Sequence, residues 1–244
     1  MDALLKRQVE EFVEVQISDF HRRRAANVES LKLVSVLTTK NPYLFRAKNL
    51  ESASDLVKAL LDARLSSAEE GLFGGFMESL AVFVSEQKCN GQKSGITGID
   101  IELIKNNVRY LIAVKSGKAW GNATQHKKLR ENFKTAVRVI KQNQSAGEIQ
   151  PTLGICYGRF KTINNGEFLH IGGQSFWQLI SNENDFYMDI VEPIGYRARE
   201  FNDDFTEKRN HAWNRMVREF TDGFCLLDGS IDWQKIVSLV SKNL

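Results

Sequence analysis

Several features that mark common protein classes are scarce in this sequence of 244 residues. Its three cysteines and four histidines lack the spacing of zinc ligands, so we expect them to be structural or incidental. No apolar run is long enough to cross a bilayer, the N-terminus lacks the apolar core of a signal peptide, and the P-loop lysine motif is missing. These absences argue against a zinc site, a membrane partner and a P-loop nucleotide site, and they predict a cytoplasmic location.

Charge is unevenly distributed along the chain, although the net charge is only +3. Residues 51–100 carry four basic and eight acidic side chains, whereas residues 101–150 carry ten basic and three acidic ones. A basic excess of this kind suits a phosphate backbone. The alternative is that the lysines of a helix in this stretch face solvent. With 42% hydrophobic residues, the chain can bury the core of one large domain or of a domain with a helical annex.

Two short runs near the middle of the chain alternate apolar and other residues as β-strands do. They cover residues 99–103 and 110–114. Asn106-Asn107 lies between them and is a good two-residue hairpin turn. The sequence therefore predicts an antiparallel hairpin.

The register of this hairpin brings an acid and a lysine near each other. Pairing Lys105 with Val108 closes the turn and sets Asp100 opposite Ala113. Lys115 then lies diagonally from Asp100, at about 7 to 8 Å between backbones, a distance that a phosphate or a hydrated metal ion can bridge. The alternative is that Asp100 only ends a turn and Lys115 only ends a strand at the solvent side.

An acid and a lysine in this arrangement suit the hydrolysis of a phosphodiester. Such hydrolysis uses a hard cation, and Mg²⁺ is held by one or two carboxylates together with waters and substrate phosphate. Asp100 is the candidate ligand. Lys115 is the candidate group that orients the attacking water and stabilises negative charge in the transition state.

The rest of the chain reads as helical, then mixed, then helical. Helical periodicity covers residues 3–40, and Asn41-Pro42 ends it. A short helix is expected over 50–63, and Ser66 or Ser67 is expected to cap a longer one that reaches residue 85. Further helices are expected over 124–142, 176–180, 205–220 and 233–240, and further strands of the same sheet over 152–157 and 168–171.

Several longer blocks carry a resemblance to a known family. They are residues 41–49, 65–70, 73–74, 98–102, 114–117 and 120–122. These blocks resemble type II restriction endonucleases of the PD-(D/E)xK superfamily, and the nearest branch cuts interrupted palindromes with GG and CC half-sites. The likeness extends from about Asn41 to Trp233. The superfamily motif alone is weak, because an acid and a lysine at this spacing occur by chance, whereas the longer blocks are much more specific.

The resemblance implies a fold, an activity and partners. The expected fold is α/β, a restriction-endonuclease-like mixed sheet flanked by helices, with helical additions at both ends. The expected domains are an N-terminal helical region over 1–40, for dimerisation or DNA contact, and a nuclease domain over 41–244. The expected activity is Mg²⁺-dependent cleavage of double-stranded DNA at a short palindrome by a homodimer, with a cognate DNA methyltransferase in the same system.

One position departs from the family pattern. The motif has an acid two residues before the lysine, and this chain has Ala113 there. Glu78 and Glu102 are the candidates for the missing carboxylate. Glu102 shares a strand face with Asp100, and Glu78 lies on the preceding helix among small apolar neighbours, which favours an acid with a partner or a metal. We rank Glu78 first. Either glutamate can also be an ordinary solvated one, and Ala113 can be an inactivating substitution.

Candidate DNA contacts follow the second strand. The loop offers glycines for close backbone approach and polar side chains for phosphates or base edges. The candidates in and after this loop are Ser116, Lys118, Asn122, Gln125, Lys127, Lys128 and Arg130. Trp120 is expected to be a packing anchor, because the bases of a duplex expose no faces.

Two other functions remain open from the sequence. One is a repair or junction-cleaving nuclease of the same superfamily. The other is a DNA-binding protein whose active site has decayed, which Ala113 would explain.

Overall fold

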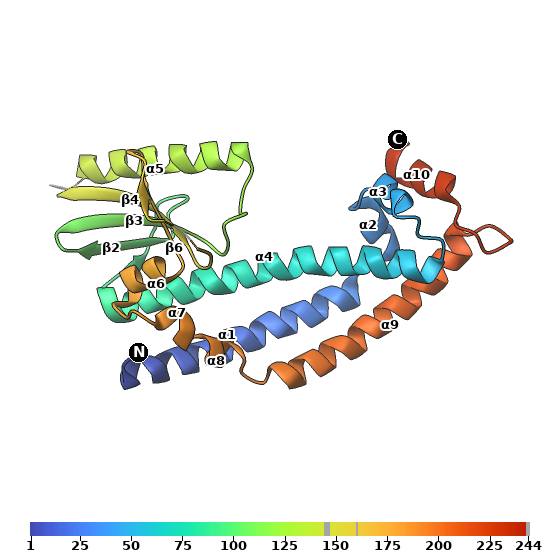
Figure 1. Cartoon of the computed structure of the whole chain (residues 1–244), viewed down its shortest axis with the longest axis horizontal. Helices are drawn as coiled ribbons and strands as arrows, with labels where there is room; N and C mark the ends of the chain where they lie inside the picture. Colours follow the sequence, from blue (N-terminus) through green and yellow to red (C-terminus); the bar gives the residue numbers. More distant parts are fainter. Residues whose placement is uncertain (144–146, 160, 243–244) are drawn as a thin grey trace. The chain divides into compact units, whose positions relative to one another are not determined.

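The computed structural model describes residues 1–143, 147–159 and 161–242 (Figure 1). The helices are α1 Ala3–Ser30, α2 Leu33–Thr38, α3 Pro42–Ala47, α4 Ala53–Cys89, α5 Ala123–Asn143, α6 Gln174–Ser181, α7 Phe186–Asp189, α8 Val191–Ile194, α9 Ala198–Phe224 and α10 Trp233–Ser241. The strands are β1 Gln92–Lys93, β2 Ile101–Lys105, β3 Val108–Lys115, β4 Glu148–Ile155, β5 Ile163–Asn164 and β6 Leu169–Gly172.

The chain packs as two compact units. The sheet unit comprises Met1–Ile17 and Phe73–Tyr196, and the helical unit comprises Ser18–Leu72 and the chain from Arg197 onward. Helices α1 and α4 each contribute one end to each unit. The predicted functional division at residue 40 stays a prediction.

The sheet unit contains a mixed sheet in the order β1-β2-β3-β4-β6-β5. Strands β3, β4 and β6 run parallel, and the remaining neighbours pair antiparallel. The predicted hairpin is confirmed, since Lys105 pairs with Val108. Asn106 and Asn107 have φ values of 50° and 62°, the left-handed pair that a tight two-residue turn of this hand requires.

Helices cover both faces of this sheet. Helix α5 packs on one face through a cluster that includes Leu111 and Ala113 of β3 and Phe133 of α5. On the other face, a Cβ at Gly154 would lie 2.4 Å from the Phe176 ring of α6, so this close contact requires glycine. Figure 1 shows α5 and α6 on opposite sides of the sheet. The expected fold class, an α/β fold with a mixed sheet flanked by helices, is confirmed.

The helical unit has a core of its own. Leu33, Phe45, Leu61, Phe220 and Ile236 are buried in one cluster, which draws on α2, α3, α4, α9 and α10. The predicted helices near the C-terminus are therefore confirmed as α9 and α10, with α9 beginning seven residues earlier than expected.

The expectation that a new helix is capped at Ser66 or Ser67 is wrong. Helix α4 runs without interruption for 37 residues. The Ser67 hydroxyl donates to the Ala63 carbonyl at 3.0 Å, a bond within a continuing helix and not a cap. Leu61, just before the expected break, and Leu65, within it, are both buried, so packing maintains the helix there.

Among the described residues, the structure contains no helix with the length and apolar character that a membrane span requires.

Candidate active site

Asp100 stands at the start of the hairpin with its carboxylate fixed in place. Its backbone N–H donates to the Ile112 carbonyl at 2.8 Å, and its Oδ2 accepts from the Val114 N–H at 2.6 Å. The chain enters this strand through Gly98, whose φ of +80° disfavours any side chain. A Cβ there would also lie 1.9 Å from Asn132 Nδ2. The turn at Gly98 and the hairpin hydrogen bonds together orient the Asp100 carboxylate.

Lys115 is the last residue of β3, where the sheet gives way to a loop. Its Nζ lies 5.7 Å from the centre of the Trp120 ring, and that ring packs on His126 at 4.3 Å. Trp120 also packs against the α5 face of the sheet. It therefore has the packing role that the sequence predicted, and it also supports the lysine side chain through a cation–π contact.

Glu78 reaches the same region from α4. Its side chain is partly buried, and burial raises the pKa of the Glu78 carboxyl. The negative charge of Asp100 raises that pKa further, while Lys115 and Lys93 lower it. The structure thus brings two carboxylates and an amine within range of each other's charges.

These groups fit a divalent cation of the magnesium type. A pair of carboxylates is what Mg²⁺ takes from protein, with waters and substrate phosphate completing its ligands. A cation beside Glu78 would also offset the repulsion from Asp100 that raises its pKa. Among the described residues, no group of three or more acid, histidine or cysteine side chains gathers as a metal cluster.

Ala113, where the family pattern has an acid, is a core residue. It is 1% exposed and packs with Leu111, Phe133 and Leu153 under α5. A carboxylate at this position would lose its hydration among apolar side chains. The packing therefore gives a physical reason for alanine at this position.

Glu102, the other candidate for the missing acid, has partners of its own. The Ser94 hydroxyl donates to its carboxylate at 2.6 Å, and an Arg109 guanidinium nitrogen lies 4.0 Å away. The acid whose charge shifts the Glu78 pKa is Asp100 and not Glu102. Glu102 as a metal ligand stays a prediction, with two groups already competing for its oxygens.

Asn122 and Gln125, predicted DNA contacts, bind each other. The Gln125 N–H donates to Asn122 Oδ1 at 3.0 Å, and the Asn122 N–H donates to Gln125 Oε1 at 2.9 Å. This reciprocal pair is a capping box at the start of α5, and the three-residue spacing in the sequence could have indicated it. Both residues are exposed, so their DNA contacts stay a prediction.

The remaining predicted DNA contacts differ in exposure. Lys118, Lys127 and Lys128 are exposed. Arg130 is partly buried, with its guanidinium 3.9 Å from the Glu167 carboxylate. Ser116 is partly buried beside α4, where its hydroxyl oxygen would lie 3.6 Å from a Cβ at Gly74.

Sequence reasoning missed polar residues at the end of the neighbouring parallel strand. Cys156, Tyr157 and Arg159 follow β4 directly. Burial, with a smaller contribution from the charge of Glu78, raises the pKa of the Cys156 thiol to about 12 against the opposite effect of Lys115. An apolar strand followed directly by polar residues could have indicated them in the sequence. Ligands often bind beyond the carboxyl ends of parallel strands, where such residues lie.

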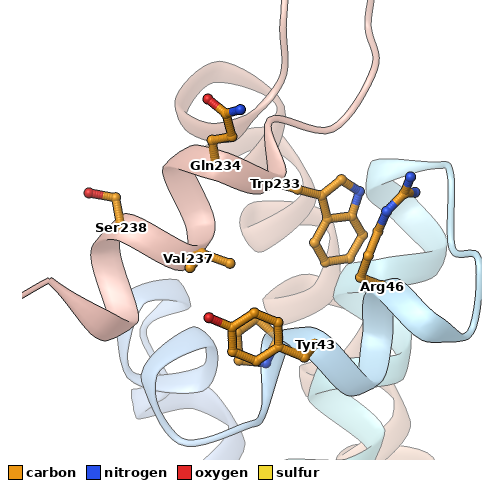
Figure 2. Close-up of a pocket in the computed structure, with 7 residues that line it drawn as sticks. Tyr43, Arg46, Trp233, Gln234, Val237 and Ser238 are labelled. Atoms are coloured by element: carbon orange, nitrogen blue, oxygen red, sulfur yellow. The ribbon is translucent and has the colours of Figure 1, made fainter.

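A separate apolar pocket lies in the helical unit between α3 and α10. Its volume is about 480 Å³, and Tyr43, Val237 and Trp233 stand around it (Figure 2). The Arg46 guanidinium lies 5.7 Å from the centre of the Trp233 ring. Its described lining contains no carboxylate, so this pocket offers no cation site for hydrolysis.

Comparison with known proteins identifies the family. A search of curated proteins finds no match to this chain. A family model described as type II restriction endonuclease EcoO109I matches residues 7–202, which is well over half of the sequence and includes Glu78, Asp100 and Lys115. The chain therefore belongs to the type II restriction endonuclease EcoO109I family, a family of DNA-cleaving nucleases.

Proposed function

We propose that this nuclease hydrolyses phosphodiester bonds of double-stranded DNA at a short palindromic site and depends on Mg²⁺. The observation that carries the proposal is the approach of Glu78 to Asp100 and Lys115, whose charges act on the Glu78 carboxyl in opposite directions. Two carboxylates beside an amine suit an ion and a phosphate in the same place. The resemblance to enzymes with GG and CC half-sites supports an interrupted palindrome.

Each of the three side chains has a distinct role in this proposal. Asp100 and Glu78 would hold the cation, and the Val114 N–H keeps the Asp100 carboxylate oriented. When bound, the ion would polarise the phosphoryl oxygen and help a water molecule lose its proton. Lys115 orients the attacking water and stabilises the negative charge that develops on the phosphoryl oxygens.

A homodimer in the cytoplasm is the proposed working form. A two-fold palindrome is matched most simply by a two-fold dimer, which sets one active site on each strand. The expected partner in the cell is a methyltransferase that protects the same DNA sequence. Sedimentation with and without a cleavable palindrome tests the dimer.

Digestion of one sequenced plasmid tests the proposed function. We expect discrete bands with Mg²⁺ and no cleavage with EDTA, and sequencing of the fragment ends gives the site. Cleavage only at junctions or flaps would instead indicate a repair nuclease. Tight DNA binding with no cleavage would indicate an inactive DNA-binding module.

A further inference from the structure

An open groove of about 830 Å³ lies in the sheet unit beyond the carboxyl ends of β4 and β6. Its apolar lining includes Phe73 and Met77 of α4 and Val191 of α8. Tyr157 and Arg159, which follow β4, provide an aromatic hydroxyl and a positive charge. The groove is therefore apolar along part of its surface and carries one basic side chain, Arg159.

This groove lies beside the loop that follows Lys115 in the candidate active site. The Cys156 N–H donates to the Lys115 carbonyl at 2.8 Å, and the Tyr157 N–H donates to the Ser116 carbonyl at 3.2 Å. These bonds extend the parallel pairing of β3 and β4 into the two loops. Met77, in the groove lining, immediately precedes Glu78. A DNA strand bound at Lys115 would therefore pass directly beside the groove.

Tyr157 lies against the loop that follows Lys115. A Cβ at Gly117 would come within 2.5 Å of the Tyr157 hydroxyl oxygen, so only glycine permits this approach. Tyr157 nevertheless remains 66% exposed. A large aromatic residue held at one edge and open on its other surfaces is suited to contact a ligand with both its ring and its hydroxyl.

Arg159 differs from Arg109 and Arg130 of the same unit. Arg109 lies 4.0 Å from Glu102, and Arg130 lies 3.9 Å from Glu167. Arg159 is exposed, and within the described part of the chain it has no acidic partner. A guanidinium without a carboxylate neighbour is available for a phosphate, which it can bind with two parallel hydrogen bonds.

We propose that the groove binds the sugar-phosphate backbone of the DNA strand beside the bond that is cut, with Arg159 on one phosphate and Tyr157 on the adjoining sugar and phosphate. The apolar lining suits the deoxyribose, and the arginine suits the phosphate charge. This inference rests on the proposed function and adds two contact residues that are remote in sequence from the hairpin.

Uncharged phosphates provide a test that needs no mutation of the protein. Once the cut position is mapped, duplexes carry a single methylphosphonate at each position near it, and binding is measured with Ca²⁺ replacing Mg²⁺ to prevent cutting. We expect one position outside the scissile phosphate to weaken wild-type binding by about tenfold, the value of one charge-assisted contact. If no such position is found with the wild-type protein, the inference is overturned.

Variants then assign that phosphate to Arg159. Arg159→Gln is expected to weaken binding of unmodified DNA by about tenfold and to be insensitive to the methylphosphonate at that one position. Tyr157→Phe, which removes only the hydroxyl, is expected to cost a few-fold, as one lost neutral hydrogen bond does. Arg7→Gln is the matched control, because Arg7 is an exposed arginine of the same unit that pairs with Glu11 on α1.

The outcomes separate this inference from the proposed function. If the wild type cuts DNA but Arg159→Gln loses no more affinity than Arg7→Gln, the groove assignment is wrong and the nuclease function stands. If Arg159→Gln remains sensitive to every methylphosphonate, Arg159 acts elsewhere and the assignment is also wrong. If the wild type neither binds nor cuts DNA, both proposals fail. Thermal melting of each variant checks that the fold is retained.

Discussion

Helix α4 carries two partly buried glutamates, Glu69 and Glu78, that have opposite surroundings. They are nine positions apart, about two and a half turns, so they lie on opposite faces of the helix. In the helical unit, Glu69 accepts a 2.7 Å hydrogen bond from Arg24, whose guanidinium carbon is 3.4 Å from the centre of the Phe205 ring. In the sheet unit, Glu78 faces the negative charge of Asp100.

The difference shows how surroundings decide the use of a carboxylate. The Glu69 carboxylate is paired with Arg24 of the same unit, so its charge contributes to stability and is not available to a ligand. Within the described residues, Glu78 has no ion-pair partner at bonding distance, and its pKa is raised. An acid with a raised pKa and no ion-pair partner is a candidate ligand for a cation that binds together with the substrate.

The strongest test removes the charges that Glu78 faces. Asp100→Asn and Lys115→Ala should each lower the cleavage rate by about 10²–10³-fold, because one loses a cation ligand and the other loses charge stabilisation of the transition state. Single-turnover cleavage measures the effect, and circular dichroism checks folding. Near wild-type cleavage by the Asp100 variant would refute the assignment.

Glu78 itself should come next in size. Glu78→Gln is expected to lower the cleavage rate by about a hundredfold and to raise the Mg²⁺ concentration needed for half-maximal rate. Glu102→Gln serves as the matched change on the strand and should matter less, since Ser94 and Arg109 already use that carboxylate. Full activity in Glu78→Gln would exclude Glu78 as the source of the missing carboxylate.

Restoring the family pattern sharpens the same point. Ala113→Glu inserts an acid into the core under α5, where Ala113 is 1% exposed. If Glu78 already supplies the missing carboxylate, this variant should gain no activity and should unfold at a lower urea concentration. A rise in cleavage rate would show instead that the wild-type site lacks an acid.

Glu69→Gln should lower stability and leave cleavage unchanged, the reverse of what is expected for Glu78→Gln. Arg24 and Glu69 have exposed side-chain fractions of only 15% and 32%, so their pairing should matter for folding. We expect a loss of about 1–3 kcal/mol in the free energy of unfolding, with cleavage per folded molecule retained. Urea unfolding followed by circular dichroism measures the loss, and an equal loss in Glu78→Gln would erase the contrast between the two residues.

The pKa of Glu78 gives a smaller and purely electrostatic signal. Without a cation, Glu78 should bind its proton at a higher pH than a glutamate of the unfolded chain, since burial and Asp100 disfavour its charged form. Its charge therefore costs stability in full above the folded pKa, and the cost shrinks as pH falls below that pKa until it is gone below the pKa of the unfolded chain. Asp100→Asn should lower the Glu78 pKa, as NMR titration of the carboxyl carbon can show. No change on this substitution would contradict the proximity of the two acids.

The smallest expected effects compare paired and unpaired cations on α5. Lys127 and Lys128 are exposed, whereas Arg130 lies near Glu167. If the two lysines face phosphates, Lys127→Ala and Lys128→Ala should each reduce the salt-dependence slope of DNA binding by about one unit. Arg130→Ala should change it less. An unchanged slope in the Lys127 and Lys128 double variant would indicate a solvated face.

The sequence predicted the local parts of this fold well. The Asn106-Asn107 turn determines the hairpin register within a few residues, so the placement of Asp100 and Ala113 followed from spacing alone. The break expected at Ser66 or Ser67 failed because capping residues also occur within helices, and burial of Leu65 decided the outcome.

The site could be predicted only in part. The small neighbours of Glu78 indicated an inward acid, but its approach to Asp100 depends on the packing of α4. Tyr157 and Arg159 were missed because parallel pairing of β3 with β4 joins residues far apart in sequence. For Asn122 and Gln125 the sequence suggested ligand contacts and the capping role was missed. Their reciprocal hydrogen bonds show that polar residues of this loop also cap a helix.

The hairpin and the groove differ in how the chain must fold to form them. Asp100 and Lys115 are joined by a two-residue turn, and hairpins of this kind close in about 1–10 μs. The parallel pairing that brings Tyr157 to Ser116 links residues about 40 positions apart, as between Val108 and Glu148, and must enclose α5. Contacts of the hairpin should therefore form first, and a destabilised protein should lose the DNA-binding groove while the acid and the lysine still stand on adjacent strands.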